Sequence, residues 1–194
     1  MTFDISAYLN AELGAHQAAF DTIQVSLQAD LANLVEVCAR SIEMGGKVMF
    51  FGNGGSAADA QHLAAELAVR YLEDRGPIAA VALTTDSSAL TAGANDMGFE
   101  NVFARQIEAL GRPGDVAIGI STSGNSANIL QALKMATSKG IVAAGFGGRD
   151  GGQMAALADP MLIVPVDDTP RIQEMHILLG HMLCGALELR LGLL

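Results

Sequence analysis

A run of small polar residues, Ser121-Thr122-Ser123-Gly124-Asn125-Ser126, places four hydroxyls and one amide around a single glycine. It leads into a helical pattern that includes Ile129, Leu130 and Leu133. Hydroxyls and backbone N–H groups at the start of a helix bind a phosphate monoester without needing a cation. One Ser is enough to cap a helix, so the surplus hydroxyls favour a phosphate ligand. The run lacks the Lys of a Walker A loop, which argues against hydrolysis of ATP or GTP.

A glycine-rich loop, Gly52-Asn53-Gly54-Gly55-Ser56, follows an earlier apolar run and also leads into a helical segment. Its backbone N–H groups are free to approach an anion. With Ala57 the loop also fits the dinucleotide pattern G-x-G-x-x-A, which is the main competing interpretation. A dinucleotide site needs an acidic residue at the end of the next strand, roughly 20 residues on. Asp86, beyond that strand, lies too far along the chain, so nicotinamide binding is disfavoured.

Histidine and carboxylate side chains supply reactive groups. His62 and Glu66 are spaced i, i+4 on the helix that begins at the glycine loop, which puts both on one face. Such a pair can share a metal or relay a proton, although taken alone it is more often a surface salt bridge or a capped core histidine than a site. Gln173 and His181 are eight residues apart, about 80° around an ideal helix. They converge on one ligand only at a wide angle or from neighbouring subunits. We expect His176 to have a packing or interface role.

Five short apolar runs predict the scaffold that holds these loops, and each is followed by a helix-like segment. Such runs are typical of strands buried on both faces of a parallel sheet. Strand–helix alternation predicts a three-layer, doubly wound α/β fold with a five-stranded parallel sheet. Ligands in these folds bind beyond the C-terminal ends of the strands, where both loops are expected. The runs are Val48–Phe51, Ile78–Leu83, Val116–Ile120, Ile141–Phe146 and Met161–Val166.

The first 45 residues predict two further helices. Apolar positions recur at helical spacing from Tyr8 to Phe20 and from Leu31 to Ile42, and Gly45-Gly46 ends the second helix. We expect the two to form an N-terminal helical hairpin. A hairpin cannot bury its apolar stripe alone, so residues 1–45 are expected to pack on the core or on a partner subunit. The whole chain, residues 1–194, is then a single domain.

Composition narrows the class of protein. The 194 residues are 51% apolar, which predicts a folded domain, and the net charge of −10 argues against nucleic acid as the main partner. The longest apolar runs are strand-sized and far short of a membrane span. The first 30 residues contain no Lys or Arg, so we expect no targeting peptide and a cytoplasmic location. Cys38 and Cys184 lie in apolar helical patterns, which predicts buried reduced thiols.

Several segments in combination resemble the sugar isomerase (SIS) family, and the resemblance covers nearly the whole chain. It implies the SIS fold and an aldose–ketose isomerase that converts sedoheptulose 7-phosphate to D-glycero-D-manno-heptose 7-phosphate for heptose and lipopolysaccharide-core precursors. It also implies a sugar-phosphate partner and a homotetramer with sites between subunits. The long Ser/Thr loop and the Arg-Ile-Gln-Glu segment are the most specific parts. The matching segments are 52–56, 61–66, 95–96, 119–128, 150–152 and 171–176.

The resemblance also implies roles for individual residues. Glu66 and His181 would be the proton-transfer pair. Some members of the family hold zinc, one per subunit, on the positions that match His62, Glu66, Gln173 and His181. The implied phosphate ligands are Ser56, Ser121, Thr122, Ser123 and Ser126. The implied sugar contacts are Asn53, Gly54, Gly55, Asn95 and Asp96, with Glu66 and Gln173 also at the substrate.

Aldose–ketose isomerisation suits a carboxylate and an imidazole. One group must carry a proton between the two carbons, and the enediolate between them must be stabilised. We expect Glu66 to move the carbon-bound proton and His181 to shuttle protons on oxygen. A metal held by both would stabilise the enediolate but weaken Glu66 as a base, and the sequence leaves these alternatives open.

Other functions also stay open. A DnaA-associating replication initiator factor shares the loops and the fold, but it lacks counterparts of Glu66 and His181. A non-catalytic phosphosugar-binding module would not need that pair either, and an isomerase for a sugar of another length would keep it. Two segments, 145–150 and 167–169, depart from the usual pattern of the family. Plain loops are the simpler explanation, and an effect on substrate choice or metal affinity is the other.

Overall fold

A five-stranded parallel sheet forms the centre of the computed structural model, which describes residues 3–194. Its strand order is β2-β1-β3-β4-β5, which confirms the predicted doubly wound α/β fold. Residues of the three central strands are almost all buried, as a sheet covered on both faces requires. The strands are β1 (Val48–Gly52), β2 (Ala80–Ala82), β3 (Val116–Ser121), β4 (Val142–Gly148) and β5 (Met161–Val164).

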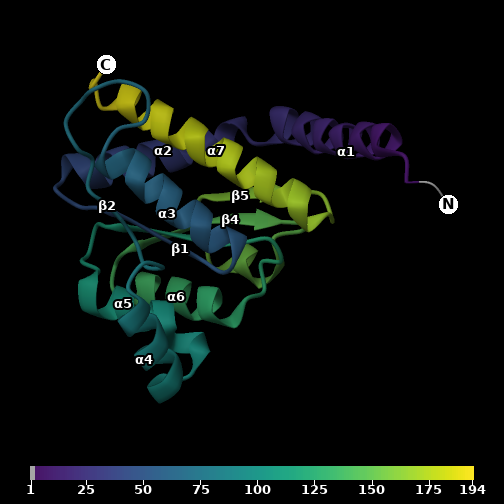
Figure 1. Ribbon diagram of the computed structural model, residues 1–194. Helices are drawn as coiled ribbons and strands as arrows, with labels where there is room; N and C mark the ends of the chain where they lie inside the picture. The colour runs from purple at the N-terminus through teal and green to yellow at the C-terminus, as the bar shows by residue number, and fades with distance from the viewer. Residues whose placement is uncertain (1–2) are drawn as a thin grey trace.

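Helices cover both faces of the sheet and complete three layers (Figure 1). Successive residues of a strand point to opposite faces. Val48 and Phe50 of β1 pack in one core, and Met49 and Phe51 pack in the other. The first core includes α2 (Gln28–Glu43), α3 (Gly55–Ala68) and α7 (Thr169–Arg190). The second includes α4 (Ser87–Met97), α5 (Val102–Leu110) and α6 (Ala127–Ser138), with short 3₁₀ turns at η1 (Phe99–Asn101) and η2 (Gly152–Ala156).

The two N-terminal helices are present, but the expected hairpin is wrong. Only Leu27 separates α1 (Ile5–Ser26) from α2, and the N–H groups of Leu27 and Leu31 still donate to carbonyls four residues back. The chain therefore bends without reversing, since a helical hairpin needs a loop of about two to five residues. α1 projects beyond the end of α7 (Figure 1). α2 packs on α7 and the sheet, and Gly45, with φ 79°, follows its last residues as predicted.

The two polar loops leave neighbouring strands whose onward connections run in opposite directions. From β1 the chain continues to β2 on one side, and from β3 it continues to β4 on the other. A doubly wound sheet has a crevice at such a switch point, outside the carboxyl ends of the two strands. The loop 52–56 after β1 and the loop 121–126 after β3 therefore meet where ligands bind in this architecture.

β2 is an edge strand and is shorter than the apolar run Ile78–Leu83. The run begins outside the sheet, because the N–H of Ile78 donates to Leu67 O at the end of α3.

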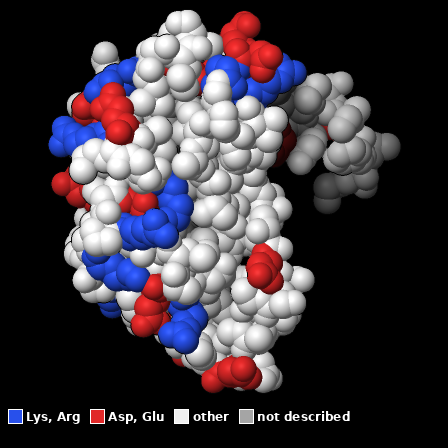
Figure 2. Space-filling view, turned by 90° about the vertical axis from the view of Figure 1, so that its left-hand side faces the viewer, with Lys and Arg blue, Asp and Glu red and all other residues white. Residues whose placement is uncertain are grey.

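On the face that Figure 2 shows, Lys and Arg side chains are interspersed with Asp and Glu, and a broad region carries no charged side chain. None of the helices described for residues 3–194 combines the length and the apolar character that crossing a membrane requires.

Candidate active site

The first loop presents main-chain N–H groups at the start of α3. Gly54 is the N-cap residue, with φ 56° and ψ −121°, a conformation that only glycine adopts readily. Among residues 3–194, no side chain caps this helix. Ser56, in the first turn, is buried. The positive end of the α3 dipole is thus left free for an anionic ligand.

The second loop clusters its hydroxyls. Ser121 Oγ lies 3.2 Å from Ser126 Oγ and 3.5 Å from Ser123 Oγ. Ser126 is the N-cap residue of α6, yet its hydroxyl makes no cap hydrogen bond and faces Ser121 instead. Helix capping therefore does not explain these hydroxyls. They are available, together with the α6 N-terminus, to a phosphate ester.

A reciprocal amide pair joins the two loops. Asn53 Nδ2 donates to Asn128 Oδ1 at 2.9 Å, and Asn128 Nδ2 donates to Asn53 Oδ1 at 2.8 Å. Asn128 is buried, and its Oδ1 also accepts from the N–H of Ile129. The pair fixes the spacing between the loops. Sequence reasoning gave Asn128 no role, although an amide just after the last loop serine was a usable signal.

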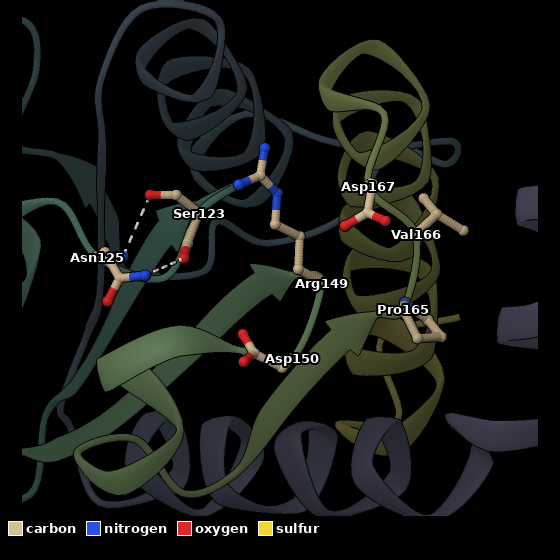
Figure 3. Close-up of a pocket in the computed structure, with 7 residues that line it drawn as sticks. All are labelled: Ser123, Asn125, Arg149, Asp150, Pro165, Val166 and Asp167. Atoms are coloured by element: carbon tan, nitrogen blue, oxygen red, sulfur yellow. Dashed lines mark hydrogen bonds between the residues drawn. The ribbon is translucent and has the colours of Figure 1, made fainter.

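A cavity of about 460 Å³ opens beside the second loop (Figure 3). Arg149 extends from the end of β4 between the turn that carries Ser123 and Asn125 and the side chain of Asp167. Its φ of 61° is uncommon for a residue with a Cβ. Arg149 and Asp167 belong to the two segments that depart from the usual family pattern, so both segments form walls next to the second loop.

Three reactive side chains come together on α3 and α7. His62 Nε2 lies 2.8 Å from His181 Nε2 and 3.4 Å from Glu66 Oε1. The two imidazole rings meet edge to face, with centroids 5.0 Å apart. Glu66 is 20% exposed and His62 is 47% exposed, so the cluster is open to a ligand on one side. The i, i+4 pair of the sequence is therefore completed by a histidine from a helix more than 100 residues away.

His62, Glu66 and His181 are side chains of the types that bind zinc, but the distances between them in this structure do not fit a zinc ion. Within residues 3–194, no group of three His, Cys, Asp or Glu side chains has the arrangement of a metal site. Two nitrogens bound to one tetrahedral zinc would be about 3.3 Å apart, so the 2.8 Å contact between His62 and His181 is too short. Two imidazoles and one carboxylate are nevertheless the ligands of many catalytic zinc sites. The distance between the two Nε2 atoms would have to widen for these side chains to hold a metal.

Gln173 lies at the first loop, separate from the histidine cluster on the same helix. A Cβ built on Gly55 would lie 2.8 Å from Gln173 Nε2, so this glycine permits the amide to approach the loop. The eight residues between Gln173 and His181 correspond to about 12 Å along a helix. Within one chain, therefore, the fourth expected metal ligand contacts the phosphate-type loop.

Asn95 and Asp96 are not brought to the loops either. They lie on the exposed face of α4, where Asn95 Nδ2 donates to Asp96 Oδ1 at 2.6 Å. Asp96 lines a separate cavity between α4 and α5. Figure 1 shows α4 at the far end of the molecule from α7. These two residues can serve a site of this kind only from another copy of the chain.

Other titratable groups have mainly structural surroundings. His176 is fully buried, its Nε2 bonds to Gly147 O at 3.0 Å, and burial lowers its pKa to about 4. Cys38 and Cys184 are buried and unpaired, as predicted, and burial raises the pKa of each thiol to about 12. Burial also raises the pKa of Asp59, one turn before His62, and its Oδ2 has no hydrogen-bond partner in the described chain.

Comparison with known proteins identifies the family. The SIS domain model matches residues 13–148. A phosphoheptose isomerase from Paramagnetospirillum magneticum (strain ATCC 700264 / AMB-1) is 57% identical over 183 residues, which cover 94% of this chain and 95% of the relative. The chain belongs to the phosphoheptose isomerase family. The resemblance on the sequence motifs is thus confirmed.

Solved structures of this family agree in fold. The phosphoheptose isomerase of Neisseria gonorrhoeae superimposes with a TM-score of 0.90 at 44% identity, over 95% of this chain and 99% of that chain. The phosphoheptose isomerase of Francisella tularensis gives a TM-score of 0.92 at 32% identity, over 96% and 100%. The SIS fold of a phosphoheptose isomerase therefore extends over nearly the whole length of this chain.

Three residues beside the reactive cluster escaped the sequence reasoning. Tyr71 stacks on His181, and Arg75 and Glu188 form a buried ion pair next to it. The only signal in the sequence was that Tyr71 and Arg75 place an aromatic ring and a cation in the connection between α3 and β2. Nothing in the spacing of these two residues linked them to Glu188, which lies more than 100 residues later.

Proposed function

We propose that this chain converts sedoheptulose 7-phosphate to D-glycero-D-manno-heptose 7-phosphate through an enediolate. As a member of the phosphoheptose isomerase family, it is an aldose–ketose isomerase. The observation that carries the assignment is the contact of His181 with the His62–Glu66 pair, together with two helix starts whose N-cap residues make no side-chain cap hydrogen bond. Carboxylate and imidazole provide the proton transfers, and the loops provide the phosphate site.

The phosphate of the substrate binds in our proposal to uncharged donors. The hydroxyl cluster of the second loop and the N–H groups at the start of α3 and α6 surround it, which reconciles phosphate binding with a net charge of −10. The residues proposed to bind the phosphate are Ser56, Ser121, Thr122, Ser123 and Ser126. Asn53, Gly54, Gly55 and Gln173 line the sugar from the first loop and the start of α7.

Glu66 is the proposed carbon acid–base catalyst. In the forward direction its carboxylate takes a proton from C1 of the ketose, and the electrons form the C1–C2 double bond of the enediolate. His181 protonates the oxygen on C2 and receives the proton from the oxygen on C1. Glu66 then returns its proton to C2, which leaves the aldehyde at C1. Each group ends in its starting protonation state.

Zinc is the proposed cofactor, one per subunit. His62, Glu66 and His181 would hold it, and Gln173 would be a fourth ligand from a neighbouring subunit, because within one chain Gln173 lies at the first loop. A bound divalent ion supplies Lewis-acid stabilisation of the enediolate oxygens. Glu66 would then have to leave the metal, at least in part, to accept a proton.

A homotetramer is the proposed assembly, within which residues 1–194 form one domain. Of the N-terminal residues 1–45, α2 packs on its own core, and α1 covers a partner subunit in this proposal, because α1 exposes an apolar row that its own chain leaves uncovered. An apolar groove of about 340 Å³ runs between α1, α2 and α7 and offers a complementary surface. Asn95 and Asp96 then reach a neighbouring site. The exposed residues of the row are Phe3, Ile5, Tyr8, Leu9 and Leu13.

We further propose that the enzyme acts in the cytoplasm and supplies heptose for lipopolysaccharide-core precursors. The support is the identity of the relatives and the absence of a helix able to cross a membrane among residues 3–194.

The contact of Glu66 and His181 with His62 favours catalysis over the DnaA-associating alternative. Capture of DnaA by this chain, together with no turnover of heptose phosphate, would reverse that choice.

The decisive experiment is incubation of the purified protein with sedoheptulose 7-phosphate, with and without a chelator, and detection of the aldoheptose product. In D2O the product should carry deuterium at C2, because the proton passes through an exchangeable carboxyl group. Loss of activity with chelator and its return with Zn²⁺ would support the cofactor.

Glu66→Gln removes the proposed base while keeping the side-chain shape. We expect kcat to fall at least ~100-fold, with binding of the phosphate ester largely kept. Glu73→Gln is the matched control, because Glu73 is exposed on the connection after α3. Normal turnover by Glu66→Gln would refute the catalytic assignment.

A further inference from the structure

A buried ion pair lies directly behind the reactive cluster. Arg75 Nε donates to Glu188 Oε1 at 2.7 Å, and the two side chains are 1% and 0% exposed. Arg75 comes from the connection between α3 and β2, and Glu188 comes from the second half of α7. The pair therefore links the two helices that carry Glu66 and His181.

Arg75 donates hydrogen bonds to the last carbonyls of α3 in addition to its bond with Glu188. Its Nη2 donates to Glu66 O at 2.8 Å, and its Nη1 donates to Leu67 O at 2.8 Å and to Gly76 O at 3.0 Å. The last carbonyls of a helix have no partners within the helix. One guanidinium thus fixes the backbone at Glu66 itself, in the last turn of α3, and ties it to α7.

Glu188 in turn holds the residue that contacts His181. Its Oε1 also accepts from the N–H of Tyr71 at 3.2 Å. The Tyr71 ring stacks on the His181 imidazole, with centroids 5.5 Å apart and an angle of 28° between planes. His181 therefore lies between two rings, Tyr71 on one side and His62 on the other.

Stability alone is a poor reason for this arrangement. Burying two charges costs several kcal/mol of desolvation per ion, and well-packed apolar residues often do as well. Moreover, Glu188 Oε2 is buried without a hydrogen-bond partner in the part of the chain that the structure describes. What the pair does provide is a fixed distance between α3 and α7 at the level of the reactive side chains.

We propose that Tyr71, Arg75 and Glu188 are positioning residues that set Glu66 and His181 relative to each other. Arg75 and Glu188 lock the backbone at Glu66 to α7, and Tyr71 holds the plane of the His181 ring. Arg75 and Glu188 are buried away from any ligand, and Tyr71 acts in this proposal through its contact with His181. The inference rests on the proposed function, because it takes Glu66 and His181 as the proton-transfer pair.

Tyr71 allows a test by conservative rescue. Tyr71→Phe keeps the ring and should retain kcat within about 2-fold, whereas Tyr71→Leu and Tyr71→Met remove it. Misplacement by 1 Å can cost about 100-fold in rate, so we expect these two variants to lose at least ~10-fold in kcat. Their KM should change less than about 3-fold, since the phosphate loops are untouched. Two replacements of different shape guard against a folding failure of one.

Glu188→Gln tests the ion pair with its shape preserved. The amide is a weaker acceptor for Arg75, so kcat should again fall ~10-fold or more while KM is kept. Glu73→Gln makes the same chemical change on an exposed neighbour of Arg75 and should leave kcat and KM at wild-type values. Thermal unfolding of each purified variant is measured alongside, so that kcat refers to folded protein.

The outcomes separate this inference from the proposed function. His181→Gln should abolish turnover; normal activity of that variant would remove the proposed catalytic pair itself. If His181→Gln is inactive while Tyr71→Leu, Tyr71→Met and Glu188→Gln keep wild-type kcat, the positioning role alone is wrong. A lower unfolding temperature with unchanged kcat in these variants would likewise show a purely structural role.

Discussion

The phosphate-type loops and the α3–α7 cluster solve different problems with different materials. The loops use uncharged hydroxyls, amides and glycines at the ends of β1 and β3, joined by the Asn53–Asn128 pair. The cluster uses a carboxylate and two imidazoles on helices, backed by the buried pair of Arg75 and Glu188. The polar groups of each loop are thus consecutive in sequence, whereas His181 lies more than 100 residues from His62 and Glu66.

The difference follows from what each task requires. A phosphate needs several donors in a fixed concave arrangement, which consecutive residues at a helix start provide. Proton transfer needs two groups whose separation is held within a fraction of an ångström, which only packed helices and their supports provide. Damage to the loops should therefore change binding, and damage to the helix contacts should change turnover.

Gly124→Ala should damage the loop region most. Gly124 has φ 64°, and a Cβ there would overlap the carbonyl oxygen of Gly151. A left-handed conformation costs a residue with a Cβ about 1–2 kcal/mol, and the overlap adds to this. We expect at least about 2 kcal/mol loss in the free energy of unfolding, and weak binding of the phosphate ester by the folded fraction.

Chemical denaturation and ligand titration of this variant would check both effects. Gly93→Ala is the control, since a Cβ at that α4 position would make only ordinary contact with Val102. It should be neutral or stabilising, because alanine favours a helix interior by about 1 kcal/mol over glycine. Equal stability of the two variants would contradict the close approach of the loops at Gly151.

The His176 contact joins α7 to the end of β4, and the stability that it provides should depend on pH. His176, on α7, bonds to Gly147 O at the end of β4, and burial lowers its pKa to about 4 from 6.5. Above pH 6.5 this histidine is neutral in both folded and unfolded chains. Between pH 6.5 and 4 only the unfolded chain binds the proton, so stability falls as the pH falls. The total loss is about 3 kcal/mol.

Unfolding of the wild type and of His176→Gln over pH 7 to 4 measures this contribution. The glutamine variant should be less stable at pH 7, and the difference should shrink as the pH approaches 4, because only the wild type has a histidine to protonate. A difference independent of pH would show that His176 titrates normally in the folded protein.

The sequence predicted the scaffold better than the contacts between its parts. Short apolar runs gave all five strands, because each strand is buried on both faces and its signal is local. The expected hairpin failed because the single residue Leu27 decides whether the chain bends or reverses. Apolar periodicity marks the two helices on either side of it and carries no information on their angle.

The site divides in the same way. The loop hydroxyls and the His62–Glu66 face followed from spacing within a few residues, whereas the proton-transfer role of His181 came only from resemblance to the family. No local pattern could place Gln173 at Gly55 rather than beside His181, since that depends on where α7 crosses α3. Tyr71 and Arg75 were missed for the same reason, as their partners lie on α7.

Ser126→Ala gives the smallest expected effect and the sharpest distinction within the loop region. If Ser126 binds the phosphate, losing one hydrogen bond to a charged acceptor, worth about 1.5 kcal/mol, should raise KM ~10-fold with kcat nearly unchanged. Because the Ser126 hydroxyl faces Ser121 and does not cap α6, the free energy of unfolding should change by less than about 0.5 kcal/mol.

Asp86→Ala is the matched comparison, since Asp86 Oδ1 does cap α4 by accepting from the N–H of Ala89. That variant should lose about 1 kcal/mol of stability and keep its KM. A stability loss in Ser126→Ala as large as that of Asp86→Ala, with KM unchanged, would return Ser126 to the role of an ordinary helix cap and weaken the phosphate site.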